Sequence, residues 1–175
     1  MTGSSEPPKL RATAPPSDVS ASLRRVARNV SLRVEGLVPP KKDGANSMWR
    51  SATALPLIKE LRTQAVAAMA GDPPLDEPVR LTLRVFLPRQ ADPSALWARR
   101  VYGDLDNFIT GVCDALQMAD ARAFDADDWL HVPADTNPSR TIAFTDDSWV
   151  HAIHAEVVDA DDSRPAYDVE IRPLR

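Results

Sequence analysis

The sequence predicts an α+β domain in which a small mixed β-sheet carries two helices on one face. Three observations support this prediction: a globular composition, an alternating apolar pattern over residues 79–87, and an apolar stripe at helical spacing over residues 105–117. Hydrophobic residues make up 43% and charged residues 26% of the 175 residues, as in typical folded domains. A chain of this length has room for one domain of ordinary size.

The N-terminal region is expected to form a tail followed by the first strand. Residues 1–27 are rich in Ser, Pro, Ala and Arg and lack periodic apolar residues, so we expect a disordered tail. Residues 29–38 alternate apolar and polar side chains, as a half-buried strand does. Pro39-Pro40 should end this strand because proline cannot donate a ladder hydrogen bond. The folded domain is therefore expected to span residues 28–175.

The rest of the domain should alternate helices and strands. Residues 55–69 carry apolar side chains at helical spacing and predict the first helix. Strict alternation over residues 79–87 predicts a strand with one buried face, and the apolar stripe over residues 105–117 predicts a second helix. Alternation over residues 149–158 and 166–172 predicts two closing strands. The resulting order β–α–β–α–β–β favours two helices on one face of the sheet.

Charge and cysteine content narrow the class of protein. Residues 1–100 hold 16 Lys and Arg against 9 Asp and Glu, whereas residues 101–175 hold 5 against 16. This asymmetry fits a polyanionic partner beside a metal site, or two solvated faces of opposite sign. The single cysteine, Cys113, excludes an intrachain disulfide framework, and the sequence contains no apolar run long enough to span a membrane. We therefore expect a cytoplasmic protein with no membrane partner.

Two pairs of aspartates are the strongest candidates for chemistry. Asp104 and Asp106 lie at the start of the second predicted helix, and Asp146 and Asp147 precede the next strand. Aspartates also cap helix N-termini and form turns, so neither pair alone establishes a function. Carboxylate oxygens are, however, the ligands that Mg²⁺ prefers. In a compact α+β domain the two pairs can meet at one rim of the sheet and share a divalent ion.

Three short motifs together resemble the core signature of the RusA family of Holliday junction resolvases. They are Gly103-Asp104-Leu105-Asp106-Asn107, Asp114-Ala115-Leu116 and Asp146-Asp147. The loop Val38-Pro39-Pro40-Lys41-Lys42 is similar to the Pro-Pro loop of that family. The resemblance covers residues 30–173 and agrees with the predicted order of elements.

The resemblance implies a homodimeric endodeoxyribonuclease that resolves four-way DNA junctions by paired symmetric nicking, in DNA recombination and repair. It also implies dependence on Mg²⁺, with Mn²⁺ as a possible substitute. The residues that match the family's catalytic and metal-holding aspartates are Asp104, Asp106 and Asp147, with Asp146 as a further metal ligand. The expected DNA contacts are Lys41, Lys42, Arg99, Arg100 and Asn107.

The sequence departs from the family pattern at two places. The family lysine one helical turn after the second motif aspartate is Thr110 here, so a lysine or arginine of the basic half would have to supply its charge. The segment of residues 118–145 is longer than the family's connection and rich in aspartate, which would repel phosphate beside a DNA site. Two alternatives therefore stay open: a catalytically impaired branched-DNA-binding protein of the same fold, and a small protein-interaction domain.

Overall fold

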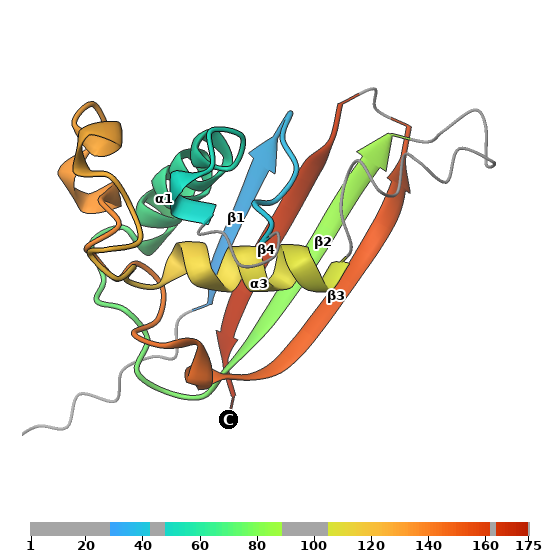
Figure 1. Cartoon of the computed structure of the whole chain (residues 1–175). Coiled ribbons are helices and arrows are strands. Elements are labelled where there is room, and N and C mark those ends of the chain that lie inside the picture. The colour runs from blue at the N-terminus through green and yellow to red at the C-terminus, as the bar shows by residue number, and fades with distance from the viewer. Residues whose placement is uncertain (1–28, 43–47, 89–104, 162–163, 175) are drawn as a thin grey trace, which may run out of the picture.

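Figure 1 shows the computed structural model, which describes residues 29–42, 48–88, 105–161 and 164–174. The predicted tail, residues 1–27, lies outside this part of the chain. None of the described helices is both long and apolar enough to cross a membrane. In chain order the elements are β1 (Val30–Glu35), η1 (Met48–Arg50), α1 (Leu55–Met69), β2 (Val79–Pro88), α3 (Leu105–Leu116), η2 (Ala126–Trp129), η3 (Ala134–Thr136), η4 (Asp147–Trp149), β3 (Val150–Ala160) and β4 (Ala166–Pro173), where η marks a short 3-10 helix.

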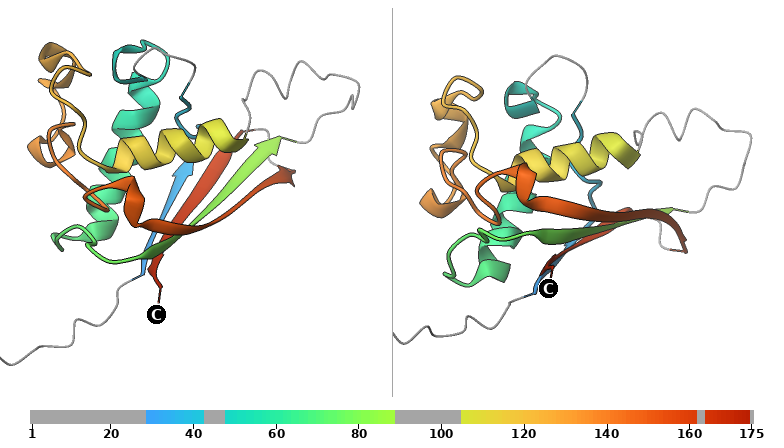
Figure 2. Two further views of the ribbon diagram at one scale, coloured as in Figure 1. Left: turned by 60° about the horizontal axis from the view of Figure 1, so that its bottom comes forward. Right: turned by 90° about the horizontal axis from the view of Figure 1, so that it is seen from below.

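The four strands form one mixed sheet in the order β1-β4-β2-β3. β4 runs antiparallel between β1 and β2, so that Val169 lies opposite Leu32 on one side and Leu83 on the other. β3 runs parallel to β2, with Ile153 opposite Leu81. Helices α1 and α3 cover the same face of the sheet, and no described helix covers the other face, which we call the open face (Figure 2). The predicted α+β fold, element order and helix placement are confirmed.

The first strand is shorter than the sequence pattern indicates. β1 ends at Glu35, although alternation continues to Val38. Gly36 adopts a left-handed backbone with φ 76°, which glycine tolerates and which turns the chain out of the strand. The Gly36 N–H donates to the Pro165 carbonyl at 2.8 Å. The chain then leads Pro39 and Pro40 to buried positions beside α3.

Apolar side chains of the strands and both helices meet in one core. On the helix side of β2, Val79, Leu81, Leu83 and Val85 are fully buried, as the sequence pattern predicts, whereas Leu87 near the end of the strand is half-buried. The apolar stripe of α3 is buried as well, and Cys113 within it is 6% exposed. The residues that fill the centre of this core are Ile58, Leu61, Leu81, Leu83, Phe108, Val112, Leu116, Val169 and Ile171.

A charged side chain, Arg62 of α1, is fully buried in this fold. Its guanidinium lies 5.5 Å from the ring centroid of Trp49. Burial lowers the pKa of Arg62 to about 10, so the group stays protonated at neutral pH. It donates hydrogen bonds to the carbonyls of Ala115, Gln117, Thr136, Asn137 and Arg140. Arg62 therefore joins the end of α3 to residues 118–145, which we call the acidic segment.

A pair of tryptophans also holds the acidic segment against α1. Trp129 of η2 is buried and its ring centroid lies 6.0 Å from that of Trp49. The Lys59 ammonium lies 5.3 Å from the Trp129 ring centroid. The acidic segment is thus packed on the α1 end of the molecule, as the orange part of Figure 1 shows.

Candidate functional site

One side of α3 carries the polar residues of the predicted signature. Asp106 is exposed in the first turn, and the Thr110 hydroxyl donates to the Asp106 carbonyl at 2.9 Å. Asp114 follows four residues after Thr110 and Gln117 three residues later. Residues three and four apart are neighbours on a helix surface, so these four side chains form one stripe, which we call the polar edge of α3. The opposite side of the helix faces the core.

The Pro39–Lys42 loop packs directly on this helix. The Lys42 N–H donates to the Asn107 carbonyl at 3.3 Å. Gly111 meets the loop so closely that a Cβ built on it would lie 2.1 Å from the Pro40 carbonyl oxygen and 2.9 Å from the Lys41 Cα. Only glycine therefore allows the loop and the helix to approach to this distance.

We expect Gly111→Ala to lower the free energy of unfolding by about 2 kcal/mol, because the new methyl group overlaps the Pro40 backbone. Alanine is the better helix former by about 1 kcal/mol, so an isolated helix would respond in the opposite direction. Urea unfolding followed by circular dichroism measures the change. Thr110→Ala on the exposed side is the matched control and should stay within about 0.5 kcal/mol. A more stable Gly111→Ala variant would contradict the packing of the loop.

Lys42 places its ammonium group on the polar edge of α3. Its Nζ lies 3.0 Å from Asp114 Oδ2, and the lysine side chain is 49% exposed whereas the aspartate is 18% exposed. The main chain of Lys42 is bound at Asn107 and its side chain reaches Asp114. The lysine therefore reaches along α3 from Asn107 to Asp114 and places its charge four residues after Thr110, the position at which the family pattern would have its lysine.

Asp147 reaches the far end of the same edge through Gln117. The Asp147 N–H donates to Gln117 Oε1 at 3.2 Å, and Gln117 Nε2 donates to Asp114 Oδ1 at 3.3 Å. The pKa of the buried Cys113 thiol is raised to about 12, first by burial and then by the charges of Asp147 and Asp114. Cys113 is therefore a neutral thiol at physiological pH, and the Asp147 charge lies close to the C-terminal half of α3.

Asp146 positions Asp147 by capping the 3-10 helix η4, which begins at Asp147. Its side-chain Oδ1 accepts a hydrogen bond from the Ser148 N–H at 2.8 Å. This hydrogen bond lowers the pKa of Asp146, so its carboxylate stays ionised. Asp146 therefore acts as an N-cap residue, as aspartates before a helix often do, whereas Asp147 is exposed.

The structure describes three of the four predicted metal ligands, namely Asp106, Asp146 and Asp147. Asp106 and Gln117 are eleven residues apart on α3, which corresponds to about 16 Å along the helix axis. No three His, Cys, Asp or Glu side chains within the described ranges are grouped so that they could hold a metal ion. Asp104, together with Arg99 and Arg100, lies outside those ranges. The three-aspartate set thus stays a prediction.

Three residues of this region are missed by reasoning from the sequence: Arg62, Gly111 and Gln117. Gln117 has the clearest available signal, since it follows Asp114 at helical spacing and ends the predicted helix. Arg62 and Gly111 act through backbone atoms of distant segments, for which a sequence pattern has no signature.

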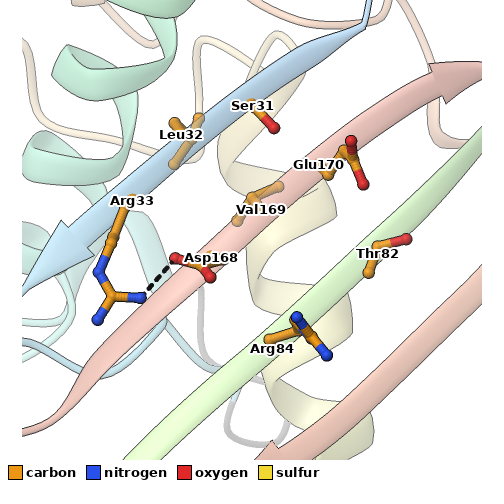
Figure 3. Close-up of a pocket in the computed structure, with 8 residues that line it drawn as sticks. All are labelled: Ser31, Leu32, Arg33, Thr82, Arg84, Asp168, Val169 and Glu170. Atoms are coloured by element: carbon orange, nitrogen blue, oxygen red, sulfur yellow. Dashed lines mark hydrogen bonds and ion pairs between the residues drawn. The ribbon is translucent and has the colours of Figure 1, made fainter.

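A shallow hollow of about 350 Å³ lies away from this region, on the open face of the sheet (Figure 3). Strands β1, β4 and β2 line it, and its cations are paired with carboxylates. Arg33 lies 2.9 Å from Asp168, and Arg84 contacts Glu156. Such exposed ion pairs contribute little to stability, and the hollow lies on the face opposite to α3. We assign it no part in the candidate site.

Comparison with known proteins bears on the identity of the chain. A search of curated proteins gave no match. A protein-family model described as Endodeoxyribonuclease RusA matches residues 39–134, a range that begins in the loop at Pro39 and contains the whole of α3. Because this match covers more than half of the 175 residues, the chain belongs to the RusA family of Holliday junction resolving endodeoxyribonucleases.

Proposed function

We propose that this protein is a Mg²⁺-dependent endonuclease that resolves four-way DNA junctions by paired symmetric nicking as a homodimer. The observation that carries the proposal is the polar edge of α3, where Asp106, Lys42, Asp114 and the Gln117-bound Asp147 follow one another along one side of the helix. A protein-interaction domain would have no need for an exposed motif aspartate and a carboxylate-bound lysine on the same side of one helix.

The carboxylates of Asp104, Asp106 and Asp147 would hold the metal, with Asp146 as a further ligand. Their oxygen atoms are hard ligands of the kind that Mg²⁺ and Mn²⁺ bind. When bound, the ion supplies a water of lowered pKa and stabilises charge on the scissile phosphate. The exposed side chain of Asp106 and the exposed Asp147 fit such a role.

The positive charges at the site would hold DNA phosphates. The proposed DNA contacts are Lys41, Lys42, Arg99, Arg100 and the uncharged Asn107. Lys42 is the best supported of these, because its half-exposed ammonium lies 3.0 Å from Asp114 Oδ2, four residues after Thr110 on the same side of α3. We therefore propose that Lys42 supplies the charge that threonine cannot. Binding carried by such contacts weakens steeply as salt is raised.

Lys42→Ala should lower the kcat/KM of junction cleavage by about 10-fold to 100-fold, because a preorganised cation beside the scissile phosphate is lost. Stability should change by less than about 1 kcal/mol, since the ion pair with Asp114 is partly exposed. Thr110→Lys in the Lys42→Ala background should restore a large part of the rate. Lys59→Ala, which removes a lysine from α1, is the control for overall charge. If Lys42→Ala keeps full activity, another residue must supply the positive charge that Thr110 lacks.

The direct test is cleavage of a mobile four-way junction by the full chain with Mg²⁺. Strand-specific end labels should show nicks at symmetric positions in two opposed strands, and linear duplex of the same sequence should stay intact. Tight junction binding without nicks in both Mg²⁺ and Mn²⁺ would instead support the catalytically impaired branched-DNA-binding protein, which the uncharged Thr110 favours. Failure to bind branched DNA at low salt would contradict both.

A further inference from the structure

Gln117, at the C-terminal end of α3, links two other parts of the fold. Its Nε2 donates to Asp114 Oδ1 at 3.3 Å, and its Oε1 accepts a hydrogen bond from the Asp147 N–H at 3.2 Å. Asp114 in turn holds Lys42, whose Nζ lies 3.0 Å from Asp114 Oδ2. A continuous chain of polar contacts therefore runs from the Pro39–Lys42 loop along α3 to η4, which lies beside the end of this helix (Figure 2).

The donors and acceptors of this chain of contacts fit together in one order. A carboxylate only accepts hydrogen bonds, whereas a glutamine amide donates through its nitrogen and accepts through its oxygen. Asp114 therefore takes the NH₂ group of Gln117 and leaves the amide oxygen to the main-chain N–H of Asp147. Because the second oxygen of Asp114 is occupied by Lys42, this carboxylate sets the direction of both of its partners.

The centre of this chain of contacts is better shielded from water than its two ends. The Asp114 side chain is 18% exposed and Gln117 is half-buried, whereas the Lys42 side chain is 49% exposed and Asp147 is exposed. Hydrogen bonds are stronger where water is partly excluded. The shielded pair can therefore fix the directions of the two exposed groups, which carry the charges proposed to act on DNA and on the metal ion.

Gln117 is also the residue that ties η4 to the helix. Within the described part of the chain, the other hydrogen bonds of residues 145–149 are local and join groups of this segment to Asp146 and Thr145. These local contacts shape the turn but do not fix it against α3. The position of Asp147 therefore depends on a side chain that lies outside the three motifs of the family.

We propose that Asp114 and Gln117 are positioning residues of the candidate site. Asp114 holds the Lys42 ammonium and orients the Gln117 amide, and Gln117 holds the main chain of Asp147. One pair of side chains thus places both a cation for DNA and a carboxylate for the metal ion, without itself contacting the reacting atoms. The inference rests on the proposed nuclease function and adds two residues that belong to none of its predicted catalytic, metal or DNA-binding sets.

Gln117→Leu tests one end of the chain of contacts, because it removes both hydrogen bonds of the amide at similar volume. Calorimetric titration of the DNA-free variant with Mn²⁺ should give an affinity about 10-fold lower than that of wild type, as is typical when a partner that orients a metal ligand is lost. The dissociation constant for a four-way junction in EDTA should change less than about twofold, since Lys42 keeps its contact with Asp114. The melting temperature should stay within about 4 °C of wild type.

Gln64→Leu is the matched control. Gln64 on α1 also donates through Nε2 to a carboxylate oxygen, Glu60 Oε1, at 2.9 Å. Its substitution removes a contact of the same kind away from the polar edge of α3, and it should change neither the Mn²⁺ affinity nor junction binding by more than about twofold. Equal losses of Mn²⁺ affinity in both variants would mean general destabilisation and would overturn the role of Gln117.

An exchange of donor and acceptor tests the direction of the contacts. Gln117→Glu alone places two carboxylates against each other and should lower the Mn²⁺ affinity at least about 10-fold. In the double variant Asp114→Asn/Gln117→Glu, the new asparagine donates to the new glutamate, which still accepts from the Asp147 N–H. The Mn²⁺ affinity should then return to within about threefold of wild type. Junction cleavage at saturating Mg²⁺ should stay about 10-fold slower, because Lys42 has lost the carboxylate that holds it.

Hydrogen exchange of the Asp147 amide, measured by NMR, tests the contact without metal or DNA. It should be at least about threefold faster in Gln117→Leu than in wild type. Unchanged exchange, wild-type Mn²⁺ affinity in Gln117→Leu, or a double variant no better than Gln117→Glu would overturn the role of Gln117. Wild-type cleavage by the double variant would overturn the role of Asp114. Each of these results beside an active wild type would leave the proposed function standing, whereas a wild type that neither binds Mn²⁺ nor cleaves junctions would contradict that function itself.

Discussion

Asp106→Asn is expected to reduce the rate of junction cleavage at saturating Mg²⁺ at least about 100-fold, because a metal-holding carboxylate becomes a neutral amide. The fold should be unaffected. Asp106 is exposed, and its main-chain carbonyl accepts the hydrogen bond from Thr110, so no described contact of the fold depends on the carboxylate. Its interaction with the helix dipole is worth about 0.3–1 kcal/mol. Single-turnover cleavage and thermal unfolding, measured on the same preparation, separate the two effects.

The control for this prediction is Asp127→Asn. Asp127 is also exposed in the first turn of a helix, η2, and belongs to the acidic segment rather than to α3. Its substitution changes the net charge by the same amount and should leave cleavage within about twofold of wild type. Equal losses in both variants would mean that cleavage responds to overall charge, and an unchanged rate in Asp106→Asn would exclude this carboxylate from the reaction.

Arg62→Met should lower the free energy of unfolding by at least about 3 kcal/mol, because it leaves five buried or half-buried carbonyl groups without their donor. Methionine keeps much of the apolar volume but also removes the guanidinium that lies 5.5 Å from the Trp49 ring centroid, so the loss combines the hydrogen bonds with this cation–π contact. Arg62→Lys should fall between wild type and Arg62→Met, since an ammonium has fewer donors and no planar fork. Urea unfolding measures all three proteins.

The effect should also be local to the acidic segment. Hydrogen exchange in Arg62→Met should increase first around Thr136–Arg140, whose carbonyls the guanidinium binds. The matched control is Lys59→Met, because Lys59 lies on the same helix as Arg62 and its ammonium contacts the Trp129 ring. This substitution should lower the free energy of unfolding by less than about 1 kcal/mol. A loss below about 1 kcal/mol in Arg62→Met would contradict the role assigned to the buried guanidinium.

Most of the fold could be predicted because its elements have clear local patterns. The strand β2 alternates strictly, and its residues Val79, Leu81, Leu83 and Val85 are fully buried. The helix α1 begins and ends where its apolar spacing predicts, and Pro73 and Pro74 follow it. The error at β1 has a local cause: the alternation continues past Gly36, but a left-handed glycine ends the strand.

The placement of the acidic segment could not be predicted, because it depends on one buried arginine that binds irregular backbone far away in the sequence. The polar edge of α3 was predictable from spacing, and the motif identified Asp106 and Asp147 as candidates. The link from Asp114 to Asp147 through Gln117 could not be predicted, because it joins a helix side chain to a main-chain N–H thirty residues later.

The claim on which the proposed function depends is that Asp104 and Asp106 share a divalent ion with Asp147, although the main chain of Asp147 is bound at Gln117, at the other end of α3 from Asp106. Calorimetric titration of the DNA-free protein with Mn²⁺ measures this most directly, with Asp104→Asn and Asp147→Asn beside the wild type. We predict saturable binding of the ion by wild type, accompanied by a higher melting temperature, and affinities at least about 10-fold lower in both variants. Wild-type affinity in the Asp147→Asn variant would contradict the shared site.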